Sequence, residues 1–299
     1  MDITLYRCDA FTTTPGKGNP AGVVLDAKDL TEEQMQRIAA WAGYSETAFV
    51  LPSDKADLQL RYFTPGKEVP LCGHATVGSM WLLRQQGRIP EGTLQVETKA
   101  GVIPVEAVER NGRTQIGMTQ VPYQEKPFGG NKKDLMEAIG LTEEDLDPRF
   151  PVLYGYTGLW TLMLPIRSME AFGRMQRQTE RFPVILTEEP GASIHPFCLG
   201  GMLEGAQIHA RHFSSPFTGI GEDPVTGTAS GVTGAYYKRY IAPDPSKSYL
   251  VVMEQGLEIG TQGIVETAVQ EDPAAPPQIF GTAVQVESFA LDPDKLPEK

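Results

Sequence analysis

The sequence predicts an α+β fold made of two similar domains, each an antiparallel sheet wrapped around one central helix. The first observation behind this prediction is an internal repeat, in which short strings of the first half recur in the same order in the second half. The second is that each half has strands rich in Val, Ile, Tyr and Phe, followed by one hydrophobic helix that begins at a glycine. A chain of 299 residues, 40% of them hydrophobic, is long enough for two domains that each bury a core.

Three pairs of matching strings define the repeat, and each pair is separated by about half the chain. Single matches of this length occur by chance, but three in the same order predict a duplicated domain. The pairs and their offsets are Arg61–Thr64 with Arg211–Ser214 (150), Gly73–Thr76 with Gly227–Ser230 (154), and Val96–Gly101 with Val251–Gly256 (155).

The first half contains two predicted helices among short strands. Thr31 and Gln34 form a capping box, and the apolar stripe that follows predicts a helix that ends at Gly43. The segment 75–86 is apolar on most of its surface and is closed by Gly87, so it predicts the buried central helix. Strands are predicted at 3–11, 21–25, 46–51, 58–63, 93–96, 102–108 and 114–118.

A crossover between the domains is predicted at 121–130, where two prolines and a Gly-Gly pair interrupt all periodicity. We therefore place the first domain at 1–120, with a C-terminal strand from about 280–299, and the second at 121–279. In the second domain, helices are predicted at 134–139 and 169–177, and strands at 154–165 and 206–213.

Composition excludes several classes of protein. A formal net charge of −12 disfavours a nucleic-acid or anionic-membrane binder, because such binding needs clustered Lys and Arg. No apolar run is long enough for a membrane span and no signal segment is evident, so we expect a cytoplasmic protein. Cys8, Cys72 and Cys198 have no paired spacing and are expected to be free thiols. His209 and His212 face opposite sides of a predicted strand without a third ligand nearby, so no metal site is expected.

The two helix starts, Gly73–His74 and Gly227–Thr228, are the first candidates for chemistry. A helix N-terminus presents unpaired N–H donors and a partial positive charge, which suit a carboxylate or an oxyanion. Alternatively, both glycines only allow a helix to pack closely on a sheet, but the repeat matches best at these starts and favours binding. His74 is then an acid/base or a donor to substrate, or else a structural histidine.

Three further side chains are candidates. Glu46 enters an apolar strand, where burial would raise its pKa and make it a general base and then acid, unless it is only a solvated strand-start residue. Asp223 precedes the second helix as a catalytic carboxylate or as a cap. Cys72 directly precedes Gly73, where a helix terminus would lower its thiol pKa. The repeat places Thr226 at the equivalent position, so a symmetric two-cysteine mechanism is not available.

Six motifs, ordered across most of the chain, resemble one known family. They are Asp9–Phe11, Gly18–Val23, Ser45–Phe49, Arg61–Pro65, Cys72–Thr76 and Glu222–Gly227. Together they resemble the phenazine-biosynthesis PhzF-like isomerase family, a branch of the diaminopimelate epimerase-like fold that also includes proline racemases.

The resemblance implies two similar domains around a cleft, a homodimer, no metal or organic cofactor, and isomerisation by proton transfer. In the family's characterised isomerase the substrate is a dihydro-hydroxyanthranilate. By resemblance, the residue matching Glu46 moves the proton, and the positions matching Gly73, His74, Asp223 and Thr228 bind the substrate or assist.

Two positions depart from that isomerase. Thr228 stands where it has serine, and Cys72 stands where it has no thiol, whereas proline racemases have a cysteine before Gly-His. The leading hypothesis is a cofactor-independent isomerase of a small carboxylate-bearing metabolite, with Glu46 as general acid/base and the amides of Gly73 and Gly227–Thr228 holding the carboxylate in an interdomain cleft. The alternatives are a racemase or epimerase that uses Cys72 as one base, and a catalytically silent metabolite-binding protein.

Overall fold

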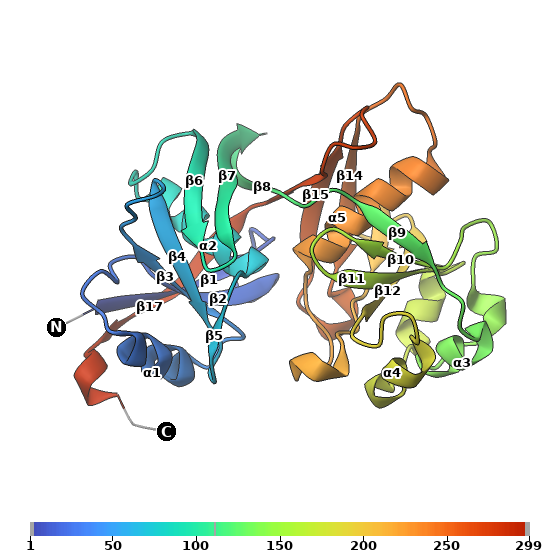
Figure 1. Ribbon diagram of the computed structural model, residues 1–299, viewed down its shortest axis with the longest axis horizontal. Helices are drawn as coiled ribbons and strands as arrows, with labels where there is room; N and C mark the ends of the chain where they lie inside the picture. Colours follow the sequence, from blue (N-terminus) through green and yellow to red (C-terminus); the bar gives the residue numbers. More distant parts are fainter. Residues whose placement is uncertain (1–2, 111, 297–299) are drawn as a thin grey trace. The chain divides into compact units, whose positions relative to one another are not determined.

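The computed structural model of the protein describes residues 3–110 and 112–296 (Figure 1). Residues 1–2, 111 and 297–299, which fall in the first predicted domain, lie outside the described residues. Within the described ranges, no helix is long and apolar enough to cross a membrane.

The chain divides into two compact units: unit 1 is Met1–Thr119 with Phe280–Lys299, and unit 2 is Gln120–Ile279. Unit 1 contains two helices, α1 (Glu32–Ala42) and α2 (Gly73–Gln85). Its strands are β1 (Ile3–Ala10), β2 (Asn19–Val24), β3 (Thr47–Leu51), β4 (Leu58–Phe63), β5 (Glu68–Val69), β6 (Gly92–Thr98), β7 (Gly101–Arg110), β8 (Arg113–Thr119) and β17 (Ala283–Leu291), with β16 (Gln278–Gly281) crossing the boundary between the units.

Unit 2 has one long helix, α5 (Gly227–Tyr236), and two short ones, α3 (Lys132–Glu137) and α4 (Phe182–Ile185). Figure 1 shows α5 in orange beside the strands of this unit. The strands are β9 (Gln124–Pro127), β10 (Leu153–Tyr156), β11 (Trp160–Pro165), β12 (Ser193–Leu199), β13 (Ile208–Ala210), β14 (Tyr249–Gln255) and β15 (Gly263–Val269).

The sheets are mixed, so the expectation of an antiparallel sheet is wrong. In unit 1, β2 pairs parallel with β3, and β4 with β6. In unit 2, β11 pairs parallel with β12, and β13 with β14. Parallel neighbours need a long crossover connection, and the helical segments supply it: α1 follows β2, α2 follows β4, and α5 follows β13. The sequence indicated these helices but not the direction in which each next strand returns.

Both units repeat the same series of pairings along the chain. Antiparallel and parallel pairs alternate from β1 to β7 in unit 1 and from β10 to β15 in unit 2. Leu58 of β4 pairs with Val96, and Ile208, which is equivalent to Leu58 at the repeat offset of 150, pairs with Met253. Val96 is therefore equivalent to Met253, so the third repeat match has an offset of 157 rather than the predicted 155. A slip of two residues leaves every side chain on the same face of a strand, so the hydrophobic pattern did not reveal it.

Local signals placed α1 correctly. The Thr31 hydroxyl oxygen accepts a hydrogen bond from the Gln34 backbone N–H, and the Gln34 side-chain oxygen accepts one from the Thr31 backbone N–H. These two bonds confirm the capping box. Gly43 ends the helix in the left-handed conformation, with φ of 70°.

Unit 2 was predicted less well. The predicted strand at 154–165 is the hairpin of β10 and β11, with Gly158 at φ +143° between them. The predicted helix at 169–177 is a 3₁₀ turn at Met169–Arg174. Strands β9, β12, β14 and β15 were not predicted. Strand β9 lies inside the segment expected to be a crossover, and β12 contains Pro196, a residue that usually argues against a central strand.

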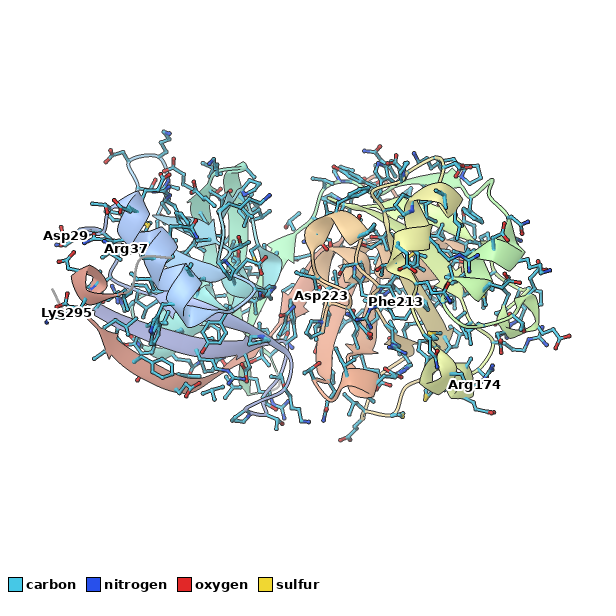
Figure 2. All side chains as sticks on the ribbon, turned by 90° about the horizontal axis from the view of Figure 1, so that it is seen from below. Asp29, Arg37, Arg174, Phe213, Asp223 and Lys295 are labelled. Carbon is cyan, nitrogen blue, oxygen red and sulfur yellow. The ribbon has the colours of Figure 1, made fainter. Side chains whose placement is uncertain are left out.

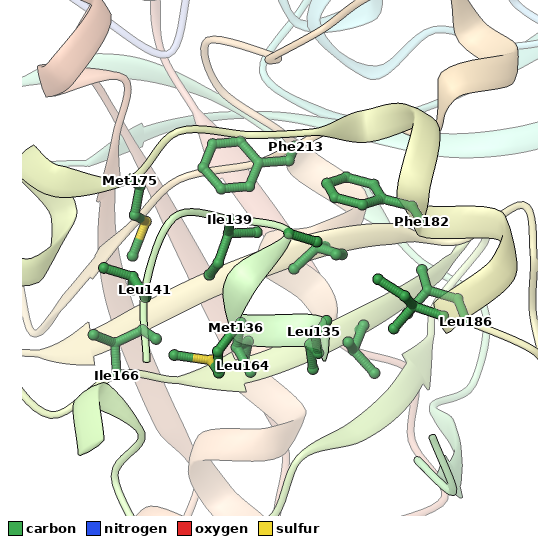
Figure 3. Packing of buried hydrophobic residues seen from close by; sticks show 14 of the residues in the cluster. Leu135, Met136, Ile139, Leu141, Leu164, Ile166, Met175, Phe182, Leu186 and Phe213 are labelled. Atoms are coloured by element: carbon green, nitrogen blue, oxygen red, sulfur yellow. The ribbon is translucent and has the colours of Figure 1, made fainter. Parts of the chain in front are cut away.

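The sheet of unit 2 is covered on both faces. In unit 2, Leu162 and Leu164 of β11 belong to a core cluster with α3 and α4, whereas Met163 between them packs in the cluster that contains Tyr236 of α5. Figure 3 shows the first cluster, with Leu135 and other apolar side chains converging on one another. Alternate side chains of a strand point to opposite faces, so α5 lies on one face and the short helices lie on the other.

Candidate active site

The start of α2 in unit 1 has an open approach. Cys72 occupies the N-cap position in an extended conformation, and its side chain makes no capping hydrogen bond among the described residues. The Thr76 hydroxyl donates to the Cys72 carbonyl over 2.7 Å and lies 2.7 Å from the Tyr62 hydroxyl, which ties the N-cap to β4. The first N–H groups of the helix are thus held in place without a side-chain cap, as an anion site requires.

Close packing does not explain the glycine at this helix start. A Cβ atom added to Gly73 would meet no heavy atom within 4 Å in unit 1. By contrast, a Cβ at Gly78 would lie 3.2 Å from Cys8 Cβ, and one at Gly234 of α5 would lie 2.4 Å from Thr267 Cγ2. The packing explanation therefore applies inside both helices but not at Gly73, where space remains for a ligand.

Three of the predicted residues meet beside this helix start. Glu46 precedes β3, and its Oε2 lies 3.2 Å from Nε2 of His74 on the first turn of α2. Cys72 Sγ lies 3.5 Å from His74 Nδ1, and Ser45 Oγ lies 3.3 Å from His74 Nε2. The side chains of Glu46 and His74 are 16% and 12% exposed, so the pair is largely buried but reachable.

The electrostatics of this group differ from the prediction. Burial alone would raise the pKa of Glu46, but hydrogen bonds from His74, Ser45 and Cys72, with the His74 charge, outweigh it and lower the pKa. Burial also works against a charged His74, yet its interactions with Cys72 and Glu46 raise its pKa well above the usual value. The expected rise in the Glu46 pKa is therefore wrong, because the pattern around Glu46 did not reveal a histidine from another element. Glu46 is therefore held in its ionised form.

Cys72 is also unlike the prediction. Its pKa is raised because burial of the sulfur outweighs the favourable charge and hydrogen bond of His74. The position before a helix suggested a lowered pKa, but that effect is smaller than the cost of charging a buried thiol. Cys72 is therefore a thiol in the resting site.

The start of α5 in unit 2 has a similar construction. Thr226 is the N-cap residue, and the Ser230 hydroxyl donates to its carbonyl over 2.8 Å, as Thr76 does to Cys72. Asp223 is not the cap: its Oδ2 accepts the Thr226 hydroxyl proton over 2.5 Å. Figure 2 shows Asp223 on the segment that precedes α5.

Gln255, at the end of β14, is a residue that the sequence reasoning missed. Its side chain is buried, accepts the Thr226 N–H over 3.3 Å, and donates to the Asp223 carbonyl over 2.7 Å and to the Thr226 hydroxyl over 3.2 Å. Gln255 therefore orients the hydroxyl that bonds the Asp223 carboxylate. It lies inside the third repeat match, but nothing in that match marks a glutamine as a partner of the helix start.

Thr228 follows Gly227 on the first turn of α5, and its carbonyl accepts the Thr157 hydroxyl over 2.9 Å. The structure thus brings Glu46, Cys72 and His74 together with Gly73 in unit 1. Asp223, Gly227 and Thr228 lie together at the start of the central helix of unit 2.

The other histidines have structural surroundings in unit 2. Both ring nitrogens of His209 bond carboxylates over 2.7 Å, those of Glu254 and Glu258, while His212 lies 3.2 Å from His195, measured between their Nδ1 atoms. His209 and His212 thus have separate partners.

Comparisons with known proteins identify relatives over most of the chain. The family model described as phenazine biosynthesis-like protein, PhzC-PhzF, matches residues 8–288. The chain is 48% identical to "Uncharacterized isomerase YfhB" of Bacillus subtilis, over 97% of this chain and 99% of that relative. It is 30% identical to trans-2,3-dihydro-3-hydroxyanthranilate isomerase of Pseudomonas chlororaphis, over 86% and 87% of the two chains.

A crystal structure of a PhzF family protein from Bacillus anthracis is similar throughout. It has a TM-score of 0.93 and 47% sequence identity, and the match covers 98% of this chain and 99% of that one. The order of strands around each central helix is thus that of a known family. The chain belongs to the phenazine biosynthesis-like, or PhzF, protein family.

Proposed function

We propose that this protein is an isomerase that moves a proton between two carbons of a small carboxylate-bearing metabolite, without a cofactor, and that Glu46 carries the proton. The observation that supports this proposal is the Glu46 carboxylate held 3.2 Å from the His74 imidazole, beside the open helix start at Gly73. The naming of its relatives as isomerases supports the same reaction class.

The proton transfer follows from the protonation states of this pair. Glu46, with its lowered pKa, is ionised at neutral pH and takes a proton from a substrate carbon, while the electron pair of that C–H bond moves into a neighbouring π bond that the substrate must supply. A carboxylate with a low pKa is a weak base. Once Glu46 has taken the proton, a ring N–H of His74 can donate a hydrogen bond to the negative charge formed in the substrate. Glu46 then returns the proton to a second carbon.

The helix starts supply the binding groups in this proposal. The N–H groups at Gly73 in unit 1 and at Gly227–Thr228 in unit 2 hold the substrate carboxylate, and Asp223 assists as a polar partner. Two observations support this role. The N-cap carbonyl of each helix accepts a hydrogen bond from a hydroxyl of the same helix, Thr76 in α2 and Ser230 in α5. Gly73 has open space beside it.

The test compares Glu46→Gln with Glu97→Gln. The first change keeps the shape of the side chain and removes the base, so turnover is expected to fall by roughly 10²- to 10⁴-fold. Glu97 is a matched control, because its side chain is about as buried as that of Glu46 while its carboxylate pairs with Lys55 and Ser53, away from the start of α2. The assay follows trans-2,3-dihydro-3-hydroxyanthranilate, the compound named for the Pseudomonas relative, and deuterium uptake from solvent into a panel of cyclic and amino-acid carboxylates. Turnover that survives Glu46→Gln would remove Glu46 from its role.

A racemase that uses Cys72 as one base is the second candidate, because Cys72 Sγ lies 3.5 Å from His74. The raised pKa of Cys72 favours the isomerase, since a racemase base must lose its proton. Cys72→Ala separates the two: the isomerase keeps its turnover, and the racemase loses it. A protein that only binds metabolites would exchange no carbon-bound proton with deuterated solvent.

A further inference from the structure

We propose that Glu46, Cys72 and His74 form a binding site for Zn²⁺, and that the bound ion inhibits the enzyme. One ligand atom from each residue, a carboxylate oxygen, the sulfur and a ring nitrogen, lies within 4.8 Å of the other two. Carboxylate, thiolate and imidazole are the three side-chain ligands that Zn²⁺ takes in proteins. Among the residues that the structure describes, Glu46, Cys72 and His74 form the group of three side chains whose possible metal-ligand atoms lie close enough together to hold one ion.

Two of the three ligand-to-ligand distances are close to the edges of a tetrahedral zinc site. A tetrahedral Zn²⁺ ion has bonds of about 2.3 Å to sulfur and about 2.1 Å to nitrogen and oxygen. Its sulfur and nitrogen ligands are then about 3.6 Å apart, and its nitrogen and oxygen ligands are about 3.4 Å apart. In the structure, Cys72 Sγ lies 3.7 Å from His74 Nε2, and this nitrogen lies 3.2 Å from Glu46 Oε2. Cys72 Sγ also lies 3.5 Å from His74 Nδ1, so the imidazole ring and the sulfur must turn toward each other before one ion can touch all three atoms.

The surroundings allow the ion to enter and leave a coordination position open. Glu46 and His74 keep 16% and 12% of their side-chain surface exposed. The space beside Gly73 is empty of atoms of unit 1 within 4 Å of an added Cβ, and Ser45 Oγ lies 3.3 Å from His74 Nε2. Three protein ligands with one open position suit a tetrahedral ion that also binds water.

Other charged clusters lack these properties. Both nitrogens of His209 are bonded by Glu254 and Glu258, and the His209 side chain is 0% exposed, so an ion would have to break two short hydrogen bonds in the core. Mg²⁺ is not expected at the Cys72 site, because it prefers an octahedral set of oxygen ligands.

Binding and inhibition are separate consequences. The binding of Zn²⁺ rests only on the geometry of the three side chains. The inhibition rests on the proposed function, because an ion bound to the Glu46 carboxylate and the His74 nitrogen leaves no free base to take a substrate proton.

The experiment titrates the full-length, reduced and metal-free protein with Zn²⁺ by calorimetry, and with Co²⁺ to detect thiolate-to-cobalt charge-transfer absorption. We expect one Zn²⁺ per chain, the charge-transfer band, and at least roughly tenfold weaker binding in Cys72→Ser and in His74→Gln. Cys198→Ser is the matched control, because Cys198 is a buried thiol of unit 2, and this variant keeps full affinity. Circular dichroism checks that each variant folds.

The outcomes separate the two claims. Equal Zn²⁺ affinity in the wild type, Cys72→Ser and His74→Gln, or no charge-transfer band with Co²⁺, overturns the site. Zn²⁺ that binds with the expected dependence on Cys72 while turnover continues leaves the site standing and refutes the role of Glu46 as proton carrier. Loss of turnover at one equivalent of Zn²⁺, restored by a chelator, supports both.

Discussion

Acid is expected to destabilise unit 2 through the buried pair His195 and His212. Their Nδ1 atoms lie 3.2 Å apart, and the two residues are 1% and 5% exposed. Burial lowers the pKa of His212 from 6.5 to about 4. Burial and the neighbouring His212 lower the pKa of His195 as well. Both rings are therefore neutral at pH 7, and protonating either one in the folded protein is costly.

The sign and size of the effect follow from these pKa values. The unfolded chain takes up a proton on His212 below about pH 6.5, whereas the folded protein does so only near pH 4, so stability falls as the pH falls through this window. The pKa difference corresponds to about 3 kcal/mol when the loss is complete. Between pH 7 and pH 5, the contribution of His212 to the loss is about 2 kcal/mol.

The assay is urea unfolding of the wild type and of His212→Asn at pH 7 and pH 5. Asn keeps a polar atom near the position of Nδ1 but does not titrate, so the variant should lose about 2 kcal/mol less on acidification than the wild type does. Trp160 fluorescence reports on unit 2, because Trp41 and Trp81 lie in unit 1 and can be replaced by Phe. Equal losses for the two proteins would refute the assignment of the acid effect to His212.

Four further changes have expected outcomes. Gly73→Ala should leave the free energy of unfolding unchanged or raise it by up to about 1 kcal/mol, while KM rises because a methyl group enters the binding space. Gly234→Ala should lower the free energy of unfolding by about 1–3 kcal/mol, because the added methyl group overpacks the core. Equal effects of the Gly73 and Gly234 substitutions in urea titrations would contradict the packing difference between the two positions. Gln255→Leu removes the hydrogen bonds that orient the Asp223 segment, so we expect a higher KM or a lower free energy of unfolding. Wild-type values of both would argue against this role of Gln255. Thr31→Ala should cost about 1 kcal/mol in thermal or urea unfolding, and no loss would mean that the capping box contributes nothing.

Elements with strong local signals were predicted well from the sequence. The capping box at Thr31 and the glycine at Gly43 specify the two ends of α1, because caps depend on residues within one turn of each other. The starts of α2 and α5 at Gly73 and Gly227 were likewise evident, since the matching strings of the repeat begin at these glycines.

Strand directions and partners were not evident, because they depend on residues far apart in the chain. A strand such as β3 has the same alternating pattern whether its neighbour runs parallel or antiparallel. The parallel pairs emerged only when the crossovers through α1, α2 and α5 were seen. The unpredicted strand β12 shows the same limit, since Pro196 lies opposite Leu164 of β11, a partner that the local sequence does not reveal.

The sequence by itself determined the identities of the chemical groups and their positions at two glycine-opened helix starts, because motif and repeat are properties of the chain alone. Only the tertiary structure decided how these groups behave. The pKa of Glu46 falls because His74 arrives from α2, the pKa of Cys72 rises because the fold buries its sulfur, and Gln255 reaches the Thr226 hydroxyl from the end of β14. Protonation and orientation depend on neighbours brought together by folding, and no local pattern encodes them.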